Sequence, residues 1–137
     1  MIKTICYISN IKTNTSQKEL RKLSHSISKK NDELHVTGVL IIQNGHFFQI
    51  MEGEESTIEN TFKKIELDKR HFGLIKLLDT TIDYRMFEDY ESGHFGIVND
   101  FSNLKKLKTY FDWIKKANIL AIDELVMLTN NFLKYST

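Results

Sequence analysis

The hydrophobic and polar positions of the chain follow two periods, and together these periods predict where strands and helices lie. Residues 36–42 and 46–51 are apolar runs joined through Asn44-Gly45, a pair that tolerates positive φ in a tight turn, so they predict a β-hairpin. Other runs rich in β-branched and aromatic residues predict strands at residues 2–9 and 72–78, with a shorter strand at 93–98.

Four segments show the spacing of amphipathic helices. Ser16 and Glu19 form a capping-box pattern, in which a hydroxyl and a carboxylate satisfy backbone donors at a helix start, so a helix is expected from there to about residue 31. Ser56 and Glu59 repeat the pattern and predict a second helix over residues 56–68. Two further amphipathic helices are expected at residues 102–116 and 119–133.

The order of these elements predicts the fold class. Strand, helix, strand, strand, helix, strand is the α+β arrangement of a ferredoxin-like βαββαβ sandwich, with both helices on one face of the sheet and one extra short strand. The other face needs a cover, and the two C-terminal helices are the candidates for that cover or for a dimer contact. With 137 residues, no proline, no repeat and no low-complexity tract, one globular unit is expected.

Composition and charge exclude several classes of function. The chain has 19 basic and 18 acidic residues, so it offers no electrostatic case for binding nucleic acid. Its start lacks the pattern of a signal peptide and no apolar stretch approaches bilayer length, so a cytoplasmic protein without membrane attachment is expected. Cys6 is the only cysteine and the histidines lack helical metal-site spacing, so neither a disulfide nor a metal site is expected.

Two polar side chains stand out among apolar neighbours. Gln49 shares a strand face with Phe47 and Met51, and a buried amide without partners costs roughly 1 to 3 kcal/mol. Tyr7 lies on an expected central strand, where its hydroxyl needs a partner. A backbone partner or partial exposure explains Gln49 without any ligand, and simple packing explains Tyr7. No phosphate-binding glycine loop, nucleophile elbow or dinucleotide fingerprint is present, so enzyme chemistry has no motif of its own.

Four blocks of sequence together resemble a known family. They are Tyr7-Ile8-Ser9, then Asn31-Asp32-Glu33-Leu34 leading to Val36-Thr37-Gly38-Val39-Leu40, then Phe47-Phe48-Gln49-Ile50-Met51-Glu52-Gly53, and finally Asp68-Lys69-Arg70-His71. In order and spacing these blocks closely resemble the signature of BLUF domains, sensors of blue light using flavin. The resemblance covers about residues 1–98.

This resemblance implies a flavin held noncovalently between the first two helices, FAD in most of the family, with FMN and riboflavin as alternatives. The residue matching Tyr7 donates an electron and a proton to the excited flavin. The glutamine matching Gln49 lies between that phenol and the flavin, and its amide rearranges after excitation. Asn31 matches a residue that hydrogen-bonds the ring. Further contacts are expected from Ser9, Lys30, Lys64, Asp68, Arg70 and His71.

The chain departs from the family pattern at three positions. Tyr90 stands where a tryptophan is common, and Ser92 stands where a methionine is common. These two positions belong to the strand proposed to relay the signal, and Ser92 is expected to offer Gln49 a hydroxyl. His35 replaces a common glycine before residues 36–38.

The sequence therefore predicts a blue-light photoreceptor rather than an enzyme, with a flavin-binding domain at residues 1–98 and a helical extension of the same unit at 99–137. Its output is expected through a protein partner or a homo-oligomer. Two alternatives remain open. One is a non-photoactive ligand-binding or protein-interaction module on the same fold. The other is a small enzyme in which Arg70 and His71 act on an anionic substrate.

Overall fold

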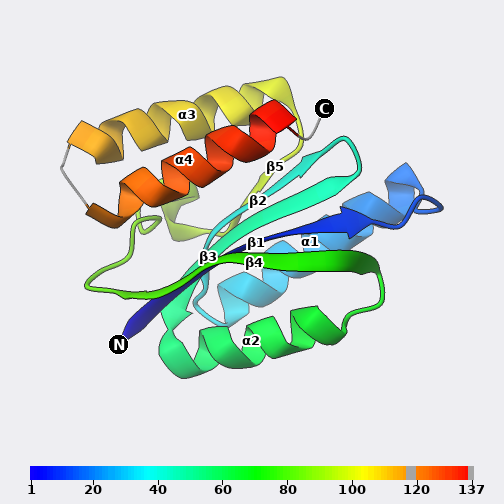
Figure 1. The fold of residues 1–137 in the computed structure, drawn as a ribbon, viewed down its shortest axis with the longest axis horizontal. Coiled ribbons are helices and arrows are strands. Elements are labelled where there is room, and N and C mark those ends of the chain that lie inside the picture. Colours follow the sequence, from blue (N-terminus) through cyan, green and yellow to red (C-terminus); the bar gives the residue numbers. More distant parts are fainter. Residues whose placement is uncertain (117–119, 136–137) are drawn as a thin grey trace.

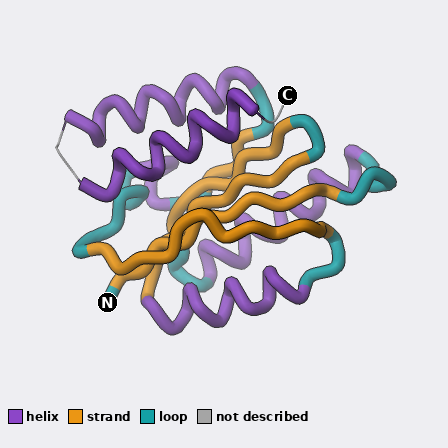
Figure 2. The backbone as a smooth tube through the Cα atoms, in the orientation of Figure 1, coloured by secondary structure: helices purple, strands orange, loops and turns teal. Residues whose placement is uncertain are grey.

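The computed structural model describes residues 1–116 and 120–135, and it arranges them in three layers around a central sheet (Figure 1). The strands are β1 Ile2–Ile11, β2 Thr37–Gln43, β3 His46–Glu54, β4 His71–Ile82 and β5 Gly96–Val98. The helices are α1 Gln17–Glu33, α2 Glu55–Leu67, α3 Phe101–Lys116 and α4 Leu120–Tyr135. Helices α1 and α2 lie on one face of the sheet, and α3 and α4 lie on the other (Figure 2).

The strand order β4-β1-β3-β2-β5 is that of a ferredoxin-like sheet with one added edge strand. β1 pairs antiparallel with β3 and β4, and β5 pairs parallel with β2. In the hairpin between β2 and β3, Asn44 and Gly45 have φ values of 49° and 81°, as the turn requires. The predicted fold class is confirmed.

Alternating side chains of the sheet pack into two separate hydrophobic cores, one on each face. On β1, Ile5 and Tyr7 face α1 and α2, whereas Cys6 faces α3 and α4. The first core is completed by apolar residues of α1 and α2, and the second by apolar residues of α3 and α4. The two C-terminal helices therefore cover the second face of the sheet, because burying both faces of β1 and β3 requires apolar partners on each side.

The two predicted capping boxes have different outcomes. At α1, the Glu19 backbone N–H donates to the Ser16 hydroxyl at 3.1 Å, and the Ser16 N–H donates to the Glu19 carboxylate at 3.4 Å. The second box is wrong, because β3 runs to Glu54 and α2 begins directly at Glu55 without a side-chain cap. Glu59 instead accepts from the Lys3 ammonium group at 3.0 Å.

The last strands and the last helix also differ in extent from the prediction. β4 continues to Ile82, whereas the predicted strand at 93–98 shrinks to Gly96–Val98. The preceding Tyr90–Gly93 forms a short 3-10 helix with φ of 49° at Glu91 and 57° at Ser92, values that a strand cannot accommodate. The predicted start of the last helix at residue 119 lies outside the described residues.

His35 explains why glycine is common at its position. Its φ is 56°, in the left-handed region that favours glycine, and it lies in the turn that leads from α1 into β2. Its carbonyl oxygen accepts a hydrogen bond from the Arg85 guanidinium at 2.7 Å. The substitution therefore keeps the turn, at the cost of a less favourable backbone conformation for a residue with a Cβ atom.

Thr4 offers a test of the packing on β1. Its hydroxyl is fully buried and has no hydrogen-bond partner among the described residues. Because an unsatisfied buried hydroxyl costs about 1 to 3 kcal/mol, Thr4→Val is expected to raise the free energy of unfolding by about 1 kcal/mol. Urea unfolding followed by circular dichroism measures the change, and Thr81→Val, at an exposed position of β4, is the matched control. A loss of stability in Thr4→Val beyond that of the control would contradict the expectation.

Candidate functional site

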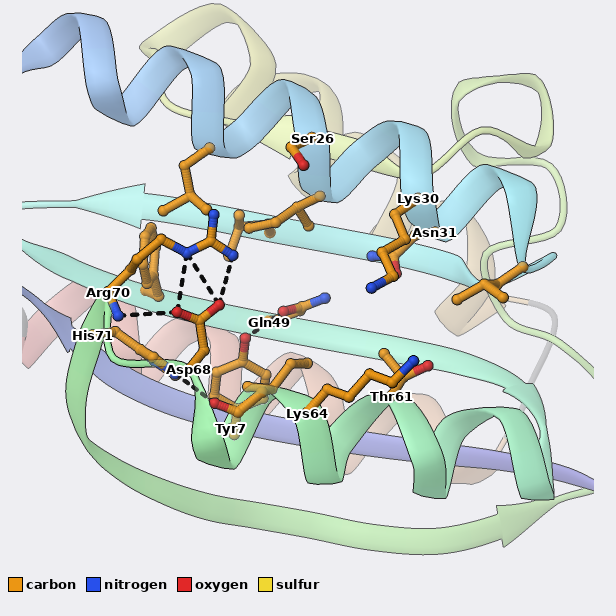
Figure 3. A pocket seen from close by; sticks show the side chains of 16 residues that line it. Tyr7, Ser26, Lys30, Asn31, Gln49, Thr61, Lys64, Asp68, Arg70 and His71 are labelled. Carbon is orange, nitrogen blue, oxygen red and sulfur yellow. Dashed lines mark hydrogen bonds and ion pairs between the residues drawn. The ribbon is translucent and has the colours of Figure 1, made fainter.

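A pocket opens between α1, α2 and the face of the sheet that these helices cover (Figure 3). Its floor comes from strands β1, β2 and β3, and its walls come from the facing sides of the two helices and from the turn between α2 and β4. The polar residues that line it are Tyr7, Ser26, Lys30, Asn31, Gln49, Thr61, Lys64, Asp68, Arg70 and His71. The apolar ones are Leu23, Ile27, Leu34, Leu40, Phe47 and Ile65.

Tyr7 and Gln49 form a buried pair on the floor of the pocket. The β1–β3 register places them directly opposite each other, and they are 3% and 1% exposed. The Tyr7 hydroxyl donates a hydrogen bond to Oε1 of Gln49. Burial raises the pKa of Tyr7 well above its usual range, and Asp68 and Cys6 add to the effect, so the phenol keeps its proton. The amide oxygen thus faces the phenol, which leaves the amide nitrogen as the donor end of Gln49.

Asn31 brings an unpaired amide to the pocket from the last turns of α1. Its side chain is 4% exposed, and its Nδ2 has no hydrogen-bond partner among the described residues. Its backbone carbonyl accepts from the Val36 N–H at 2.8 Å, which fixes the residue at the helix exit. A buried amide without a partner is unfavourable, so Asn31 provides a donor suited to a carbonyl of a bound molecule.

The exit of α2 places an ion pair at the other end of the pocket (Figure 3). The Arg70 guanidinium donates to both carboxylate oxygens of Asp68, and the shortest contact, from its terminal nitrogen, is 2.6 Å. The Arg70 backbone N–H donates to the same carboxylate at 2.9 Å. These hydrogen bonds from Arg70 lower the pKa of Asp68 below its ordinary value, so the carboxylate is ionised at neutral pH.

His71 is held between two partners whose chemistry fixes its orientation. Its Nε2 lies 2.7 Å from the Ile65 carbonyl oxygen, and its Nδ1 lies 2.7 Å from the Ser9 hydroxyl. A carbonyl oxygen only accepts, so Nε2 carries the hydrogen and, in the neutral ring, Nδ1 accepts from Ser9. Ser9 does not line the pocket but supports the histidine that does.

The remaining residues expected to contact a cofactor line this one pocket, including Lys30 from α1 and Lys64 from α2. Sequence reasoning missed Ser26 and Thr61, which approach from the two helix walls (Figure 3). Ser26 precedes Lys30 by four positions, and Thr61 precedes Lys64 by three. Residues at these spacings share a helix face, so helical periodicity applied to the two lysines identifies both.

Tyr90 and Ser92 do not line the pocket. Tyr90 is buried in the core on the other side of the sheet, against Phe87 and Tyr110. Ser92 is exposed on the 3-10 turn before β5. The expectation that Ser92 presents its hydroxyl to Gln49 does not fit this placement, because the left-handed residues at 91–93 bend the chain away before the strand begins.

The chemistry of the pocket suits a flat heteroaromatic ring with polar edges. Apolar side chains provide contact surface, while Asn31 offers an amide donor from the wall formed by α1 and Gln49 offers one from the floor. Among the described residues, no group of three or more histidine, cysteine, aspartate or glutamate side chains is arranged to hold a metal ion. Across residues 1–116 and 120–135, no helix combines the length and the apolar character needed to cross a membrane.

Comparison with known proteins identifies the family. The family model described as BLUF, sensors of blue-light using FAD, matches residues 2–93. The chain belongs to the BLUF family. The BLUF domain is a blue-light sensor that binds flavin and is not itself catalytic, so the alternative in which Arg70 and His71 serve an enzyme is not retained.

The relatives of this BLUF chain include much longer proteins. The blue light- and temperature-regulated antirepressor BluF of Escherichia coli (strain K12) is 31% identical over 78 residues, which are 57% of this chain and 19% of that protein. Photoactivated adenylate cyclase subunit beta of Euglena longa is 30% identical over 84 residues, 61% of this chain and 10% of the cyclase subunit. This chain therefore spans about a fifth or less of the length of these two curated relatives.

Solved BLUF structures share the fold. BlsA in its ground state has a TM-score of 0.65 and 28% identity, covering 77% of this chain and 69% of that chain. BlsA in its photo-activated state has the same TM-score with 29% identity, covering 77% of this chain and 75% of that chain. BlsA is thus known in two light states, and this chain resembles both in sequence as well as in fold.

The Asp68–Arg70 pair generates a pH prediction. Because the pKa of Asp68 is lowered in the folded chain, its contribution to stability is present above the ordinary value of 3.8 and is lost as the pH falls through the folded pKa. The pair is partly exposed, so Asp68→Asn is expected to cost only about 0.2–1 kcal/mol at neutral pH. Chemical unfolding at a series of pH values should show the difference from wild type vanishing in acid; a constant difference would contradict the assignment.

Proposed function

We propose that this chain senses blue light through a flavin, FAD in the first instance, held between α1 and α2 above the Tyr7–Gln49 pair. One observation carries the proposal. A buried phenol and a buried carboxamide are hydrogen-bonded on the floor of a pocket in which another buried amide, that of Asn31, has no partner. A ring with carbonyl and imine acceptors would accept hydrogen bonds from these donors. Without such a partner the donors are unfavourable, because burial keeps water from bonding to them.

Tyr7 is the proposed source of the electron and the proton. A bound flavin supplies absorption of blue light and an excited state that is a strong oxidant. The raised pKa of Tyr7 keeps its phenol neutral, so oxidation of the ring must release a proton. The hydrogen bond directs that proton to the Gln49 amide, the group that accepts it in the resting arrangement.

Gln49 is the proposed switch. Its amide has an acceptor end and a donor end, so a rotation or a tautomeric change reverses the polarity that it presents to a fixed neighbour. The side chain is 1% exposed, so water does not compete for the new hydrogen bond. A donor turned towards a flavin carbonyl stabilises the excited state, which moves the absorption band to the red.

The other pocket residues are proposed as binding groups. Asn31 holds the polar edge of the ring, while Lys30 and Lys64 supply positive charge for the polar chain that extends from it. Arg70 is neutralised by Asp68, and these two residues with His71 close the end of the pocket near the turn into β4. Ser9 contributes indirectly by orienting His71.

The output is proposed to pass through protein contacts, either with a separate partner or within a homo-oligomer in the cytoplasm. The proposed division is a flavin-binding domain at residues 1–98 and a helical extension at 99–137 that packs on the same sheet. Tyr90 and Ser92 remain proposed relay positions. Of these, Tyr90 has the stronger support, because it is buried between the sheet and α3.

The direct test is spectroscopic. The purified protein, supplied with FAD, FMN or riboflavin during preparation, is expected to show flavin absorption that moves reversibly to the red under blue light. Release of the bound flavin followed by chromatography then distinguishes FAD from FMN and riboflavin. A protein that binds flavin but shows no spectral change in light would support the non-photoactive binding module instead.

Asn31 tests the binding geometry. Asn31→Leu removes the unpaired donor while keeping the size of the side chain, and it is expected to weaken flavin affinity by about 1–3 kcal/mol, roughly 5- to 150-fold. Fluorescence titration of the flavin-free protein measures the dissociation constant. Asn60→Leu, at an exposed position of α2, is the matched control. Equal affinity in both variants would remove Asn31 from the binding site.

Gln49 tests the switch. Gln49→Leu removes the amide and leaves an apolar side chain that is one atom shorter, so flavin is expected to bind while the light-induced red shift is lost. Gln17→Leu, at an exposed position of α1, is expected to retain the shift. Difference spectra before and after blue illumination provide the measurement. A red shift that persists in Gln49→Leu would make the proposed mechanism wrong.

A further inference from the structure

Glu52 is a buried carboxylate that the pocket does not use. It lies on β3 three positions after Gln49 and is fully buried. Successive side chains of a strand point to opposite faces, so Glu52 faces the layer of α3 and α4, whereas Gln49 faces the pocket. One strand thus carries both the proposed switch and, on its other face, a buried carboxyl group whose pKa is raised by burial.

The Glu52 carboxylate organises the segment that follows β4. It accepts hydrogen bonds from the backbone N–H groups of Met86 at 2.8 Å and Phe87 at 2.6 Å, and from the Thr37 hydroxyl at 2.8 Å. Since the Thr37 hydroxyl donates to Glu52, its oxygen is the atom that accepts from the Arg85 guanidinium at 3.0 Å. Residues 85–87 have no strand partner, so these bonds fix their position against β2 and β3.

Met86 connects Glu52 to α3 through two hydrogen bonds. Its N–H donates to Glu52, and its carbonyl oxygen accepts from the Tyr110 hydroxyl at 2.6 Å. Burial raises the pKa of Tyr110 to about 12, so the phenol retains the proton that it donates. The Tyr110 ring lies 5.9 Å from the ring of Trp113, which is 60% exposed on α3. A continuous series of contacts therefore runs from β3 to the surface of α3.

We propose that Glu52 is the positioning residue through which a light-induced change in β3 beside Gln49 reaches helix α3, by way of Met86 and Tyr110. This inference rests on the proposed function, because it requires Gln49 to rearrange. A buried side chain that accepts several short hydrogen bonds in a dry environment transmits small displacements, since the loss of any one bond leaves a buried donor unpaired. Met86 and Phe87 must then follow the carboxylate when β3 shifts.

Trp113 is the natural reporter, because it is the only tryptophan of the chain. The flavin-loaded protein is prepared with 5-fluorotryptophan, so a single fluorine resonance reports on Trp113, and spectra are recorded in darkness and under blue light. The variants are Glu52→Gln, which replaces one accepting oxygen with an amide nitrogen, and Tyr110→Phe, which removes only the hydroxyl bonded to Met86. Tyr84→Phe, at an exposed tyrosine, is the matched control.

Wild type and Tyr84→Phe are expected to show both the visible red shift and a light-induced change in the Trp113 resonance. Glu52→Gln and Tyr110→Phe are expected to keep the visible red shift and to lose the change at Trp113. Tyr110→Phe alters no group in the pocket or on the sheet, so it remains informative if Glu52→Gln does not fold.

The failures are distinguishable. If wild type binds flavin but shows no red shift, the proposed function fails and this inference falls with it. If the red shift occurs while Trp113 does not respond, or responds equally in Tyr110→Phe and wild type, only the route through Glu52 is overturned. Loss of the red shift itself in Tyr110→Phe would also overturn it, since the residue would then act on the photochemistry and not on its transmission.

Discussion

The hydrogen bond between Tyr7 and Gln49 is the interaction on which the site depends, and the pairing of β1 with β3 brings the two side chains together. The register sets the two residues opposite each other, with both side chains on the face covered by α1 and α2. A slip of one residue would turn each side chain of β3 to the other core, so the register is strongly specified by burial on both faces. The geometry of the Tyr7–Gln49 pair is therefore a property of the whole sheet.

The same constraint explains how the two faces of the sheet communicate. Because both faces of β3 are dry, polar groups on it must find partners within the protein, and they do so in opposite layers. Gln49 is paired with the phenol of β1, whereas Glu52 is paired with backbone N–H groups of residues 86 and 87. Replacing either residue by an apolar one would leave buried donors unpaired on one side of the sheet only, so the proposed roles of Gln49 and Glu52 can be tested separately.

Hydrophobic periodicity predicted the order of elements and the fold class, and the family resemblance named eight of the ten polar residues that line the pocket. Sequence alone failed where tertiary contacts override local signals. The predicted cap at Ser56 does not form, because β3 continues directly into α2, and Glu59 accepts a hydrogen bond from Lys3 instead. The sequence predicted a strand at Ser92, and no local sequence pattern predicts the left-handed turn that exposes this residue. The role of Glu52 cannot be predicted from local pattern, because the backbone N–H groups that it accepts from, those of Met86 and Phe87, lie 34 and 35 positions further along the chain.

The segment between β4 and β5 is hydrogen-bonded to elements on both sides of the sheet. Two elements that line the pocket, α1 and β3, therefore each bind this segment. From α1, next to Asn31, the Asp32 carboxylate accepts from the Phe95 N–H at 2.7 Å, and the Ser28 hydroxyl donates to the Phe95 carbonyl at 3.0 Å. From β3, near Gln49, Glu52 holds Met86 and Phe87. Between these anchors Tyr90 packs against Gly96, where a Cβ atom would meet its ring at 2.5 Å. A displacement of either α1 or β3 therefore strains the same short stretch of chain, so residues 85–95 are attached both to a wall of the pocket, α1, and to its floor, β3.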